Sequence, residues 1–273
     1  MTTPIALTIA GTDPSGGAGI QADLKTFAAL GVYGASVITA LVAQNTQGVR
    51  AIHDVPVDFI RAEIDSVFDD LIVDAVKIGM LSKPAVIQTV ADALDAHGAG
   101  QIVLDPVMIA ASGDPLLDED AIGHVRDVLL PRAHLITPNL PEAATLLDTE
   151  TAETPEAMEA QAERLLALGP AAVLLKGGHG SGAQSADLLV SRDGGAPRWF
   201  VADRIATKNT HGTGCTLSSA IAAGLAKGLP LADAVAAAKT YLTEALAAAD
   251  TLTIGKGRGP VHHFHALWPS GSK

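Results

Sequence analysis

The sequence predicts an α/β fold with a mostly parallel central sheet, and two observations support this prediction. Short apolar runs alternate with helical patterns along most of the chain, which is the order that βαβ crossovers produce. The apolar runs are continuous and do not alternate with polar residues. Strands of this kind are covered on both faces, as in a parallel sheet between helices.

The elements can be assigned in chain order. The expected strands are Ile5–Ala10, Val37–Ala43, Ala75–Gly79, Gln101–Asp105, Leu135–Thr137 and Ala172–Leu175. The expected helices between them are Ile20–Leu30, Phe59–Leu71, Pro84–Ala96, Glu119–Leu129 and Pro155–Leu168. Several of these helices begin at a capping residue or a proline and end at a glycine.

An antiparallel hairpin is expected before two final helices. Its strands are Asp187–Ser191 and Trp199–Ala202, and Gly194 and Gly195 lie in the turn between them. We find no long linker, charge block or repeat, and 48% of the 273 residues are hydrophobic. The sequence therefore predicts one domain over residues 1–273.

The charge and cysteine content exclude several classes of protein. A net charge of −12 argues against a partner that is nucleic acid or an anionic membrane. Cys215 is the only cysteine, so one chain can form no disulfide and no cysteine-based metal site. The first apolar run lacks a preceding basic region, and charged residues and a proline interrupt the alanine-rich stretch 217–249. We expect a cytoplasmic protein without a membrane span.

Polar residues and glycines follow the expected strands. In an open parallel sheet, ligands bind outside the carboxyl ends of the strands. The residues at these ends are Gly11–Asp13, Gln44–Thr46, Met80, Asp105–Val107, Pro138–Asn139 and Lys176–Gly178. The sequence therefore predicts a ligand site there, with Lys176 as a phosphate contact and Gly177–Gly182 as a segment that closes over it.

The segment Asn209–Thr216 is the sharpest local motif. Its glycines let backbone N–H groups converge, and the long helix that follows adds partial positive charge at its N-terminus. We interpret Gly212, Thr213, Gly214 and Cys215 as a site for a transferring phosphoryl group. A helix N-terminus also tends to lower the pKa of a thiol. A glycine-rich turn with Cys215 as a small buried hydrophobe is the alternative.

Two carboxylates are the best magnesium ligands in the sequence. Asp105 and Glu142 both follow buried strands, and Mg²⁺ with a nucleotide takes few protein oxygens. Asn139–Glu142 fits a helix cap equally well. The chain has no Walker A motif, and Gln44 argues against reading Gly17–Ala22 as a dinucleotide loop.

Three histidines lie close together near the C-terminus, and packing explains them better than a metal site does. His262, His263 and His265 are spaced too closely to close one site. We expect core or surface histidines.

The ordered set of motifs resembles the hydroxymethylpyrimidine/phosphomethylpyrimidine kinases of thiamine biosynthesis, a branch of the ribokinase-like superfamily. The matching segments are Ile9–Gly19, Ala43–Thr46, Lys77–Leu81, Thr137–Glu142, Lys176–His179, Gly212–Cys215 and Gly259–His265. The resemblance implies a three-layer α/β/α fold, MgATP as phosphoryl donor, and a homodimer. It also implies two successive phosphorylations of 4-amino-5-hydroxymethyl-2-methylpyrimidine.

The residues themselves fit such a substrate. The amide of Gln44 can pair with an aminopyrimidine edge, and Met80 and Val107 are expected as apolar walls. Gly11 and Asp23 are expected on the substrate side, although Asp23 lies in a helical pattern and can instead face solvent. Lys176, Asn139 and Thr210 are expected on the ATP side.

For Cys215 the hypothesis is a partly ionised base that serves only the alcohol step. A phosphate nucleophile in the second step is already ionised and needs no base. Two other functions stay open: a pyridoxal kinase, which Gln44 and Cys215 disfavour, and a non-catalytic sensor, which the intact phosphoryl motifs disfavour.

Overall fold

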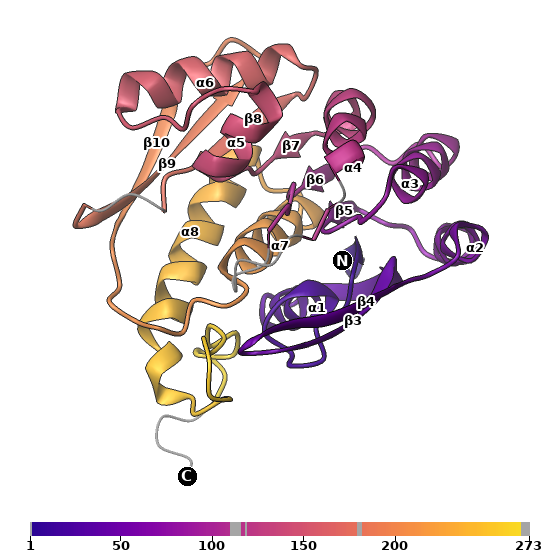
Figure 1. Cartoon of the computed structure of the whole chain (residues 1–273), viewed down its shortest axis with the longest axis horizontal. Coiled ribbons are helices and arrows are strands. Elements are labelled where there is room, and N and C mark those ends of the chain that lie inside the picture. Colours follow the sequence, from indigo (N-terminus) through magenta and orange to yellow (C-terminus); the bar gives the residue numbers. More distant parts are fainter. Residues whose placement is uncertain (1, 110–115, 118, 179–181, 269–273) are drawn as a thin grey trace.

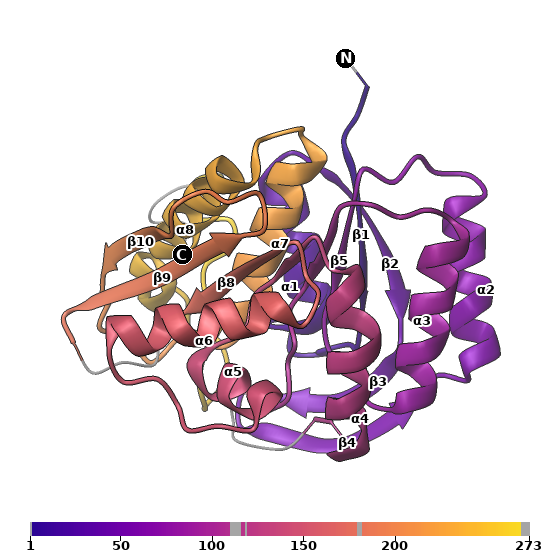
Figure 2. The ribbon, with the colours of Figure 1, turned by 90° about the horizontal axis from the view of Figure 1, so that it is seen from above.

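A sheet of eight strands runs through the molecule in the order β10-β9-β8-β7-β6-β5-β1-β2 (Figures 1 and 2). The computed structural model describes residues 2–109, 116–117, 119–178 and 182–268. The strands are β1 Ile5–Ala10, β2 Tyr33–Ile38, β5 Ala75–Ile78, β6 Ile102–Leu104, β7 Leu135–Ile136, β8 Ala172–Lys176, β9 Gln184–Ser191 and β10 Arg198–Asp203. The pairs from β2 to β8 are parallel, while β9 and β10 pair antiparallel.

Helices cover both faces of this sheet, as Figure 2 shows. They are α1 Gly19–Ala29, α2 Val57–Phe68, α3 Pro84–Ala96, α4 Glu119–His124, α5 Leu140–Leu147, α6 Pro155–Ala167, α7 Thr213–Ala226 and α8 Leu231–Ala247. Helices α1, α7 and α8 lie on one face, and α2 to α6 lie on the other. The predicted three layers and mostly parallel sheet are confirmed.

Two hydrophobic cores fill the spaces between the layers. Neighbouring strand residues point to opposite faces, so Leu7 packs in the core beside α2 and α3 while Ala6 packs in the core beside α1 and α7. Burial of each large apolar side chain stabilises the fold by roughly 1.5–3 kcal/mol. The continuous apolar runs in the sequence reflect this burial on both faces.

Helix α7 is the most deeply buried helix. All its residues from Thr216 to Ala226 are buried, because it packs against α1 and α8 and beneath the sheet. Its small side chains allow this close packing. The helix is thereby fixed with its N-terminus at the carboxyl ends of the parallel strands.

The prediction of one strand over Val37–Ala43 is wrong. Strand β2 ends at Ile38, and the chain then turns at Thr39 into β3 Ala40–Asn45, which pairs with β4 Gly48–Asp54 in a separate two-stranded sheet. The Thr39 hydroxyl is buried and donates a hydrogen bond of 3.1 Å to the Met80 carbonyl. This tertiary contact fixes the turn, and apolar periodicity does not reveal it.

Other predicted elements are confirmed with shifted ends. The hairpin of β9 and β10 is longer than expected at both strands. The helix expected over Glu119–Leu129 is α4 followed by a π-helical turn at Val125–Leu129. Among the described residues, no helix is long and apolar enough to cross a bilayer.

Candidate active site

A cavity of about 640 Å³ lies at the carboxyl ends of β1, β5, β6, β7 and β8. The N-terminus of α7 and strand β3 also line it, together with residues of α5, α8, β9 and β10. The chain order of the strands reverses between β1 and β5, and open parallel sheets bind their ligands at such a point. A cavity of this size can hold a small ligand together with the phosphate chain of a nucleotide.

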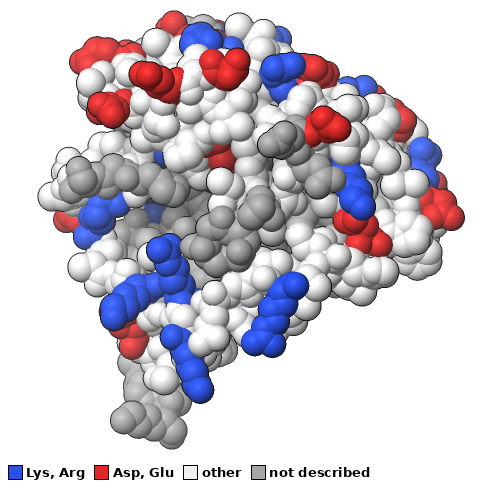
Figure 3. All heavy atoms as spheres, in the orientation of Figure 1, with Lys and Arg blue, Asp and Glu red and all other residues white. Residues whose placement is uncertain are grey.

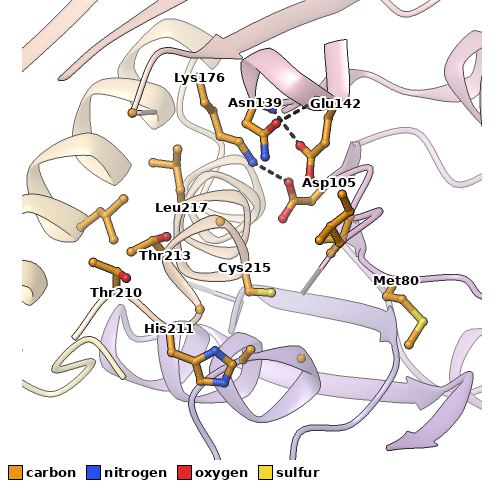
Figure 4. Close-up of a pocket in the computed structure, with 18 of the residues that line it drawn as sticks. Met80, Asp105, Asn139, Glu142, Lys176, Thr210, His211, Thr213, Cys215 and Leu217 are labelled. Atoms are coloured by element: carbon orange, nitrogen blue, oxygen red, sulfur yellow. Dashed lines mark hydrogen bonds and ion pairs between the residues drawn. The ribbon is translucent and has the colours of Figure 1, made fainter. Parts of the chain in front are cut away.

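Most of the predicted site residues line this one cavity. They are Gly11, Gln44, Met80, Asp105, Val107, Asn139, Glu142, Lys176, Thr210, Gly212, Thr213, Gly214 and Cys215. Figure 4 shows Lys176, Asp105 and Glu142 grouped on one side of Cys215, with His211 on the other. The predicted closing segment Gly177–Gly182 includes residues 179–181, which lie outside the described residues.

Asp23 does not line the cavity, and it does not face solvent. Its carboxylate is fully buried and accepts hydrogen bonds from Thr8 Oγ1 at 2.6 Å and Ser219 Oγ at 2.7 Å. It also forms an ion pair of 2.8 Å with Lys77 Nζ. The prediction of a substrate contact at Asp23 is therefore corrected, because this buried pair already satisfies the carboxylate.

Lys77 is a site residue to which the sequence analysis gave no role. It lines the cavity although its side chain is fully buried. Burial alone would lower the pKa of Lys77, but the Asp23 carboxylate raises it above the ordinary value. A lysine inside the apolar strand run Ala75–Gly79 was the signal that could have revealed it, because a buried charge needs a partner.

The N-terminus of α7 is arranged to receive an anion. Gly212 precedes the helix with φ +79, and a Cβ there would lie 1.8 Å from the Gly17 carbonyl oxygen. Only glycine fits this conformation and this close approach. No side chain among the described residues caps the helix. Thr213 N donates a long hydrogen bond of 3.4 Å to the Thr210 carbonyl, and the next N–H groups, of Gly214 and Cys215, can bind a phosphoryl group.

The surroundings of the Cys215 thiol disfavour the partly ionised form that the sequence predicts. Burial raises the pKa of Cys215 to about 11, although the Lys77 ammonium opposes this rise. A backbone hydrogen bond from Gly19 also favours the thiolate, but the loss of water around the sulfur is the largest effect. At neutral pH the thiol is therefore protonated.

Lys176 and Asp105 form a buried ion pair at the centre of the cavity wall. Lys176 Nζ lies 2.8 Å from Asp105 Oδ1, which also accepts a hydrogen bond of 3.0 Å from Thr137 Oγ1. Burial by itself would raise the pKa of Asp105, but Lys176 and Lys77 hold it below the ordinary value. Asp105 Oδ2 has only a long contact of 3.4 Å with Ser218 Oγ among the described residues. This oxygen is available to a cation.

Glu142 caps a helix and also lines the cavity, so it fits both roles that the sequence left open, a helix cap and a magnesium ligand. It forms a capping box with Asn139 at the start of α5, with two hydrogen bonds of 2.8 Å, and it also lines the cavity. Burial raises the pKa of Glu142 to about 7, against the attraction of Lys176. Among the described residues, no cluster of three acidic, histidine or cysteine groups could hold a metal. Two carboxylates still suit a magnesium ion that keeps its waters and nucleotide oxygens.

His211 and Asp13 are a second pair to which sequence reasoning gave no role. His211 Nε2 lies 2.7 Å from Asp13 Oδ2 and 3.5 Å from Gln44 Nε2. All three residues line the cavity. Their position in the motifs 9–19 and 209–216 was the available signal, although only the fold brings these motifs together.

The histidines near the C-terminus lie in the core, as expected. His262 and His263 are buried, and the His263 carbonyl accepts a hydrogen bond of 2.7 Å from the Tyr241 hydroxyl. Neither residue lines the cavity.

Comparison with known proteins identifies the family. The model of the phosphomethylpyrimidine kinase family matches residues 13–262. This chain belongs to that family. A hydroxymethylpyrimidine/phosphomethylpyrimidine kinase of Escherichia coli K12 is 57% identical and covers 96% of this chain and 98% of its own length.

Solved structures of this family and of pyridoxal kinases share the ribokinase-like fold. The phosphomethylpyrimidine kinase of Clostridium difficile 630 is 44% identical, with a TM-score of 0.78 over 89% of this chain and 99% of its own. The pyridoxal kinase of Bacillus subtilis, solved as an ADP complex, is 35% identical, with a TM-score of 0.89 over 97% of this chain and 99% of its own. The phosphomethylpyrimidine kinase fold and a nucleotide-using kinase activity are thus established for the chain.

Proposed function

We propose that this kinase phosphorylates 4-amino-5-hydroxymethyl-2-methylpyrimidine with ATP and then phosphorylates the resulting monophosphate, as a step of thiamine biosynthesis. One observation carries the proposal: Gln44 and the uncapped N-terminus of α7 line the same cavity. The Gln44 amide offers both a donor and an acceptor to the edge of an aminopyrimidine. Met80 and Val107 supply apolar walls beside it.

The first step transfers a phosphoryl group to an alcohol. The hydroxymethyl oxygen bonds to the γ-phosphorus of ATP, the bond from that phosphorus to the β–γ bridging oxygen breaks, and ADP leaves. The N–H groups at Gly212 to Cys215 and the Lys176 ammonium stabilise the charge that develops. Asp105 and Glu142 would hold the magnesium that accompanies ATP, which neutralises phosphate charge when it is bound.

Cys215 is assigned a positioning role in place of the ionised base. A thiol whose pKa is raised to about 11 removes no proton at pH 7. Phosphoryl transfer depends mainly on alignment and charge stabilisation, and the half-buried thiol lines the cavity beside the α7 N–H groups. It can therefore orient the accepting oxygen in both steps.

Pyridoxal is the competing acceptor, because a pyridoxal kinase shares the fold at 35% identity. The purified protein is incubated with MgATP and equal amounts of the hydroxymethylpyrimidine and pyridoxal, and products are followed by mass spectrometry. Pyrimidine monophosphate first and diphosphate later supports the proposal. Pyridoxal phosphate as the main product moves the assignment to the pyridoxal branch, and tight pyrimidine binding without any product favours a sensor.

A homodimer is also proposed. The β3–β4 hairpin exposes Leu41 by 50% on the face that it shares with Ala43, Ala51 and His53. An exposed apolar ribbon of this kind suits contact with a second copy of the chain. Light scattering that shows only a 27.8 kDa monomer would refute the dimer.

A further inference from the structure

The cationic side chains around the cavity differ in whether they already have a partner. Among the described residues, five lysines and arginines line the cavity: Lys77, Lys176, Arg204, Lys239 and Arg258. Lys77, Lys176 and Lys239 form ion pairs with Asp23, Asp105 and Asp187. The Arg204 guanidinium donates to backbone carbonyls of Gly178, Gly182 and Gln184. Lys77, Lys239 and Arg204 are therefore committed to holding the fold together, and Lys176 is already assigned to the phosphoryl group that is transferred in both steps.

Arg258 is the exception. Arg258 is exposed, and its guanidinium forms no hydrogen bond or ion pair with the described part of the chain. Figure 3 shows Lys and Arg side chains gathered in the lower part of the face, beside the hollow. In a chain of net charge −12, such a local cation favours an anionic ligand.

The backbone of Arg258 is held by hydrogen bonds, although no described residue pairs with its side chain. Arg258 N donates to the Thr46 carbonyl at 2.9 Å, and Gly257 N donates to Thr46 Oγ1 at 3.1 Å. A Cβ on Gly257 would lie 1.9 Å from the Thr46 carbonyl oxygen, so glycine is required for this contact. The next turn is tied to the site as well, because His211 N donates to the Gly259 carbonyl at 3.0 Å. Arg258 thus lies between the hairpin that carries Gln44 and the turn that precedes α7.

The two proposed reactions differ in one charged group. The acceptor of the first step is a neutral alcohol, whereas the acceptor of the second is a phosphate monoester with nearly two negative charges at neutral pH. In the second step an oxygen of that monoester bonds to the γ-phosphorus, the bond to the β–γ bridging oxygen breaks, and ADP leaves. MgATP and the α7 N–H groups serve both steps, so the added phosphate needs a cation that the first step does not use.

We propose that Arg258 binds the phosphate of the monophosphate acceptor and so determines specificity for the second step. The inference rests on the proposed two-step function. A guanidinium can bind two phosphate oxygens at once, and its fork geometry distinguishes it from lysine. Arg258→Ala should lower kcat/KM for the monophosphate by about tenfold to a hundredfold, with a much smaller change for the alcohol.

The test compares Arg258→Ala and Arg258→Lys with Lys256→Ala as a matched control. Lys256 is an exposed cation of the same loop that does not line the cavity. For each protein, kcat and KM are measured with the alcohol and with the monophosphate at saturating MgATP, and the KM for ATP is measured with each acceptor. Urea unfolding midpoints verify that each variant folds. If Arg258→Ala fails to fold, the comparison of the two acceptors is made with Arg258→Lys.

Support requires that the ratio of monophosphate to alcohol kcat/KM falls at least tenfold in Arg258→Ala, less in Arg258→Lys, and not in Lys256→Ala. Equal losses for the two acceptors, a raised KM for ATP with both, or an unchanged ratio would overturn the assignment. If the wild-type protein phosphorylates neither acceptor, the proposed two-step function itself is refuted. The two failures are therefore distinguishable.

Discussion

His211 Nε2 lies 2.7 Å from Asp13 Oδ2, and this contact joins two glycine loops that are 198 residues apart in the chain. The same carboxylate accepts hydrogen bonds from Ser15, Gly17 and Ala18. Burial would raise the pKa of Asp13, but the hydrogen bonds from His211 and Ser15 lower it to about 2. The loop before α1 and the turn before α7 are thus held together by one buried anion.

Replacement of that anion should loosen both loops. Asp13→Asn keeps the shape of the side chain but removes the charge that pairs with His211. We expect a loss of about 3 kcal/mol in the free energy of unfolding, because the buried N–H and O–H donors around Asp13 lose a charged acceptor. The KM for the pyrimidine should also rise, since His211 lies 3.5 Å from the Gln44 amide.

The matched control is Asp70→Asn, which neutralises an exposed carboxylate. Urea unfolding and steady-state kinetics of both variants provide the measurement. Equal stability of the two variants would contradict the structural importance of the Asp13 anion.

Buried His263 predicts how stability depends on pH. Burial lowers the pKa of His263 to about 4, whereas a histidine in the unfolded chain has a pKa near 6.5. Between about pH 6.5 and 4, His263 is therefore protonated in the unfolded state but not in the folded state. Because the unfolded state binds the extra proton, the free energy of unfolding decreases as the pH falls from about 6.5 to 4. This group alone should account for about 3 kcal/mol.

Urea unfolding at several pH values tests this expectation. His263→Gln should flatten the acid limb of the stability curve, because glutamine keeps a polar partner for Thr216 Oγ1, which lies 3.1 Å from His263 Nε2. His124→Gln changes an exposed histidine away from the proposed dimer face and is the control. An acid limb of unchanged slope in His263→Gln would show that other groups cause the loss.

Much of the fold could be predicted from local patterns, because strands buried on both faces leave continuous apolar runs in the sequence. The prediction failed at Thr39, where one buried hydroxyl turns the chain out of the sheet. A single polar contact of this kind leaves no periodic signal. The carboxyl ends of β1, β5, β6, β7 and β8 were nonetheless predicted to within two residues, whereas Gln44 lies in β3 of the separate sheet and still lines the cavity.

The residues that line the site could be predicted from the sequence, but their protonation states and ion-pair partners could not. Residues such as Gln44, Asp105 and Lys176 do line one cavity. The state of Cys215 could not be predicted, because desolvation depends on how neighbouring elements cover the sulfur. Asp23 could not be placed either, since its partner Lys77 is 54 residues away and only the fold pairs them.

Loss of either partner of the buried Lys77–Asp23 pair should destabilise the protein. Asp23→Asn leaves an ammonium buried without a counter-charge, which typically costs about 3–5 kcal/mol. The double variant Asp23→Asn with Lys77→Met removes both charges, keeps an acceptor for the Thr8 and Ser219 hydroxyls, and should recover most of that loss. Thermal unfolding of the single and double variants measures the coupling, and purely additive losses would argue against a paired role.

Cys215 provides the final prediction, because positioning and base catalysis differ in two measurable ways. A base with a pKa of about 11 would make the alcohol step accelerate about tenfold for each pH unit between 7 and 9. A protonated positioning group gives no such rise, and Cys215→Ala should then slow the alcohol and monophosphate steps by similar factors. We expect the second pattern, with Cys215→Ser retaining more activity than Cys215→Ala in both steps. Single-turnover rates of each step against pH provide the measurement, and a steep pH dependence that is confined to the alcohol step and lost in Cys215→Ala would restore the base.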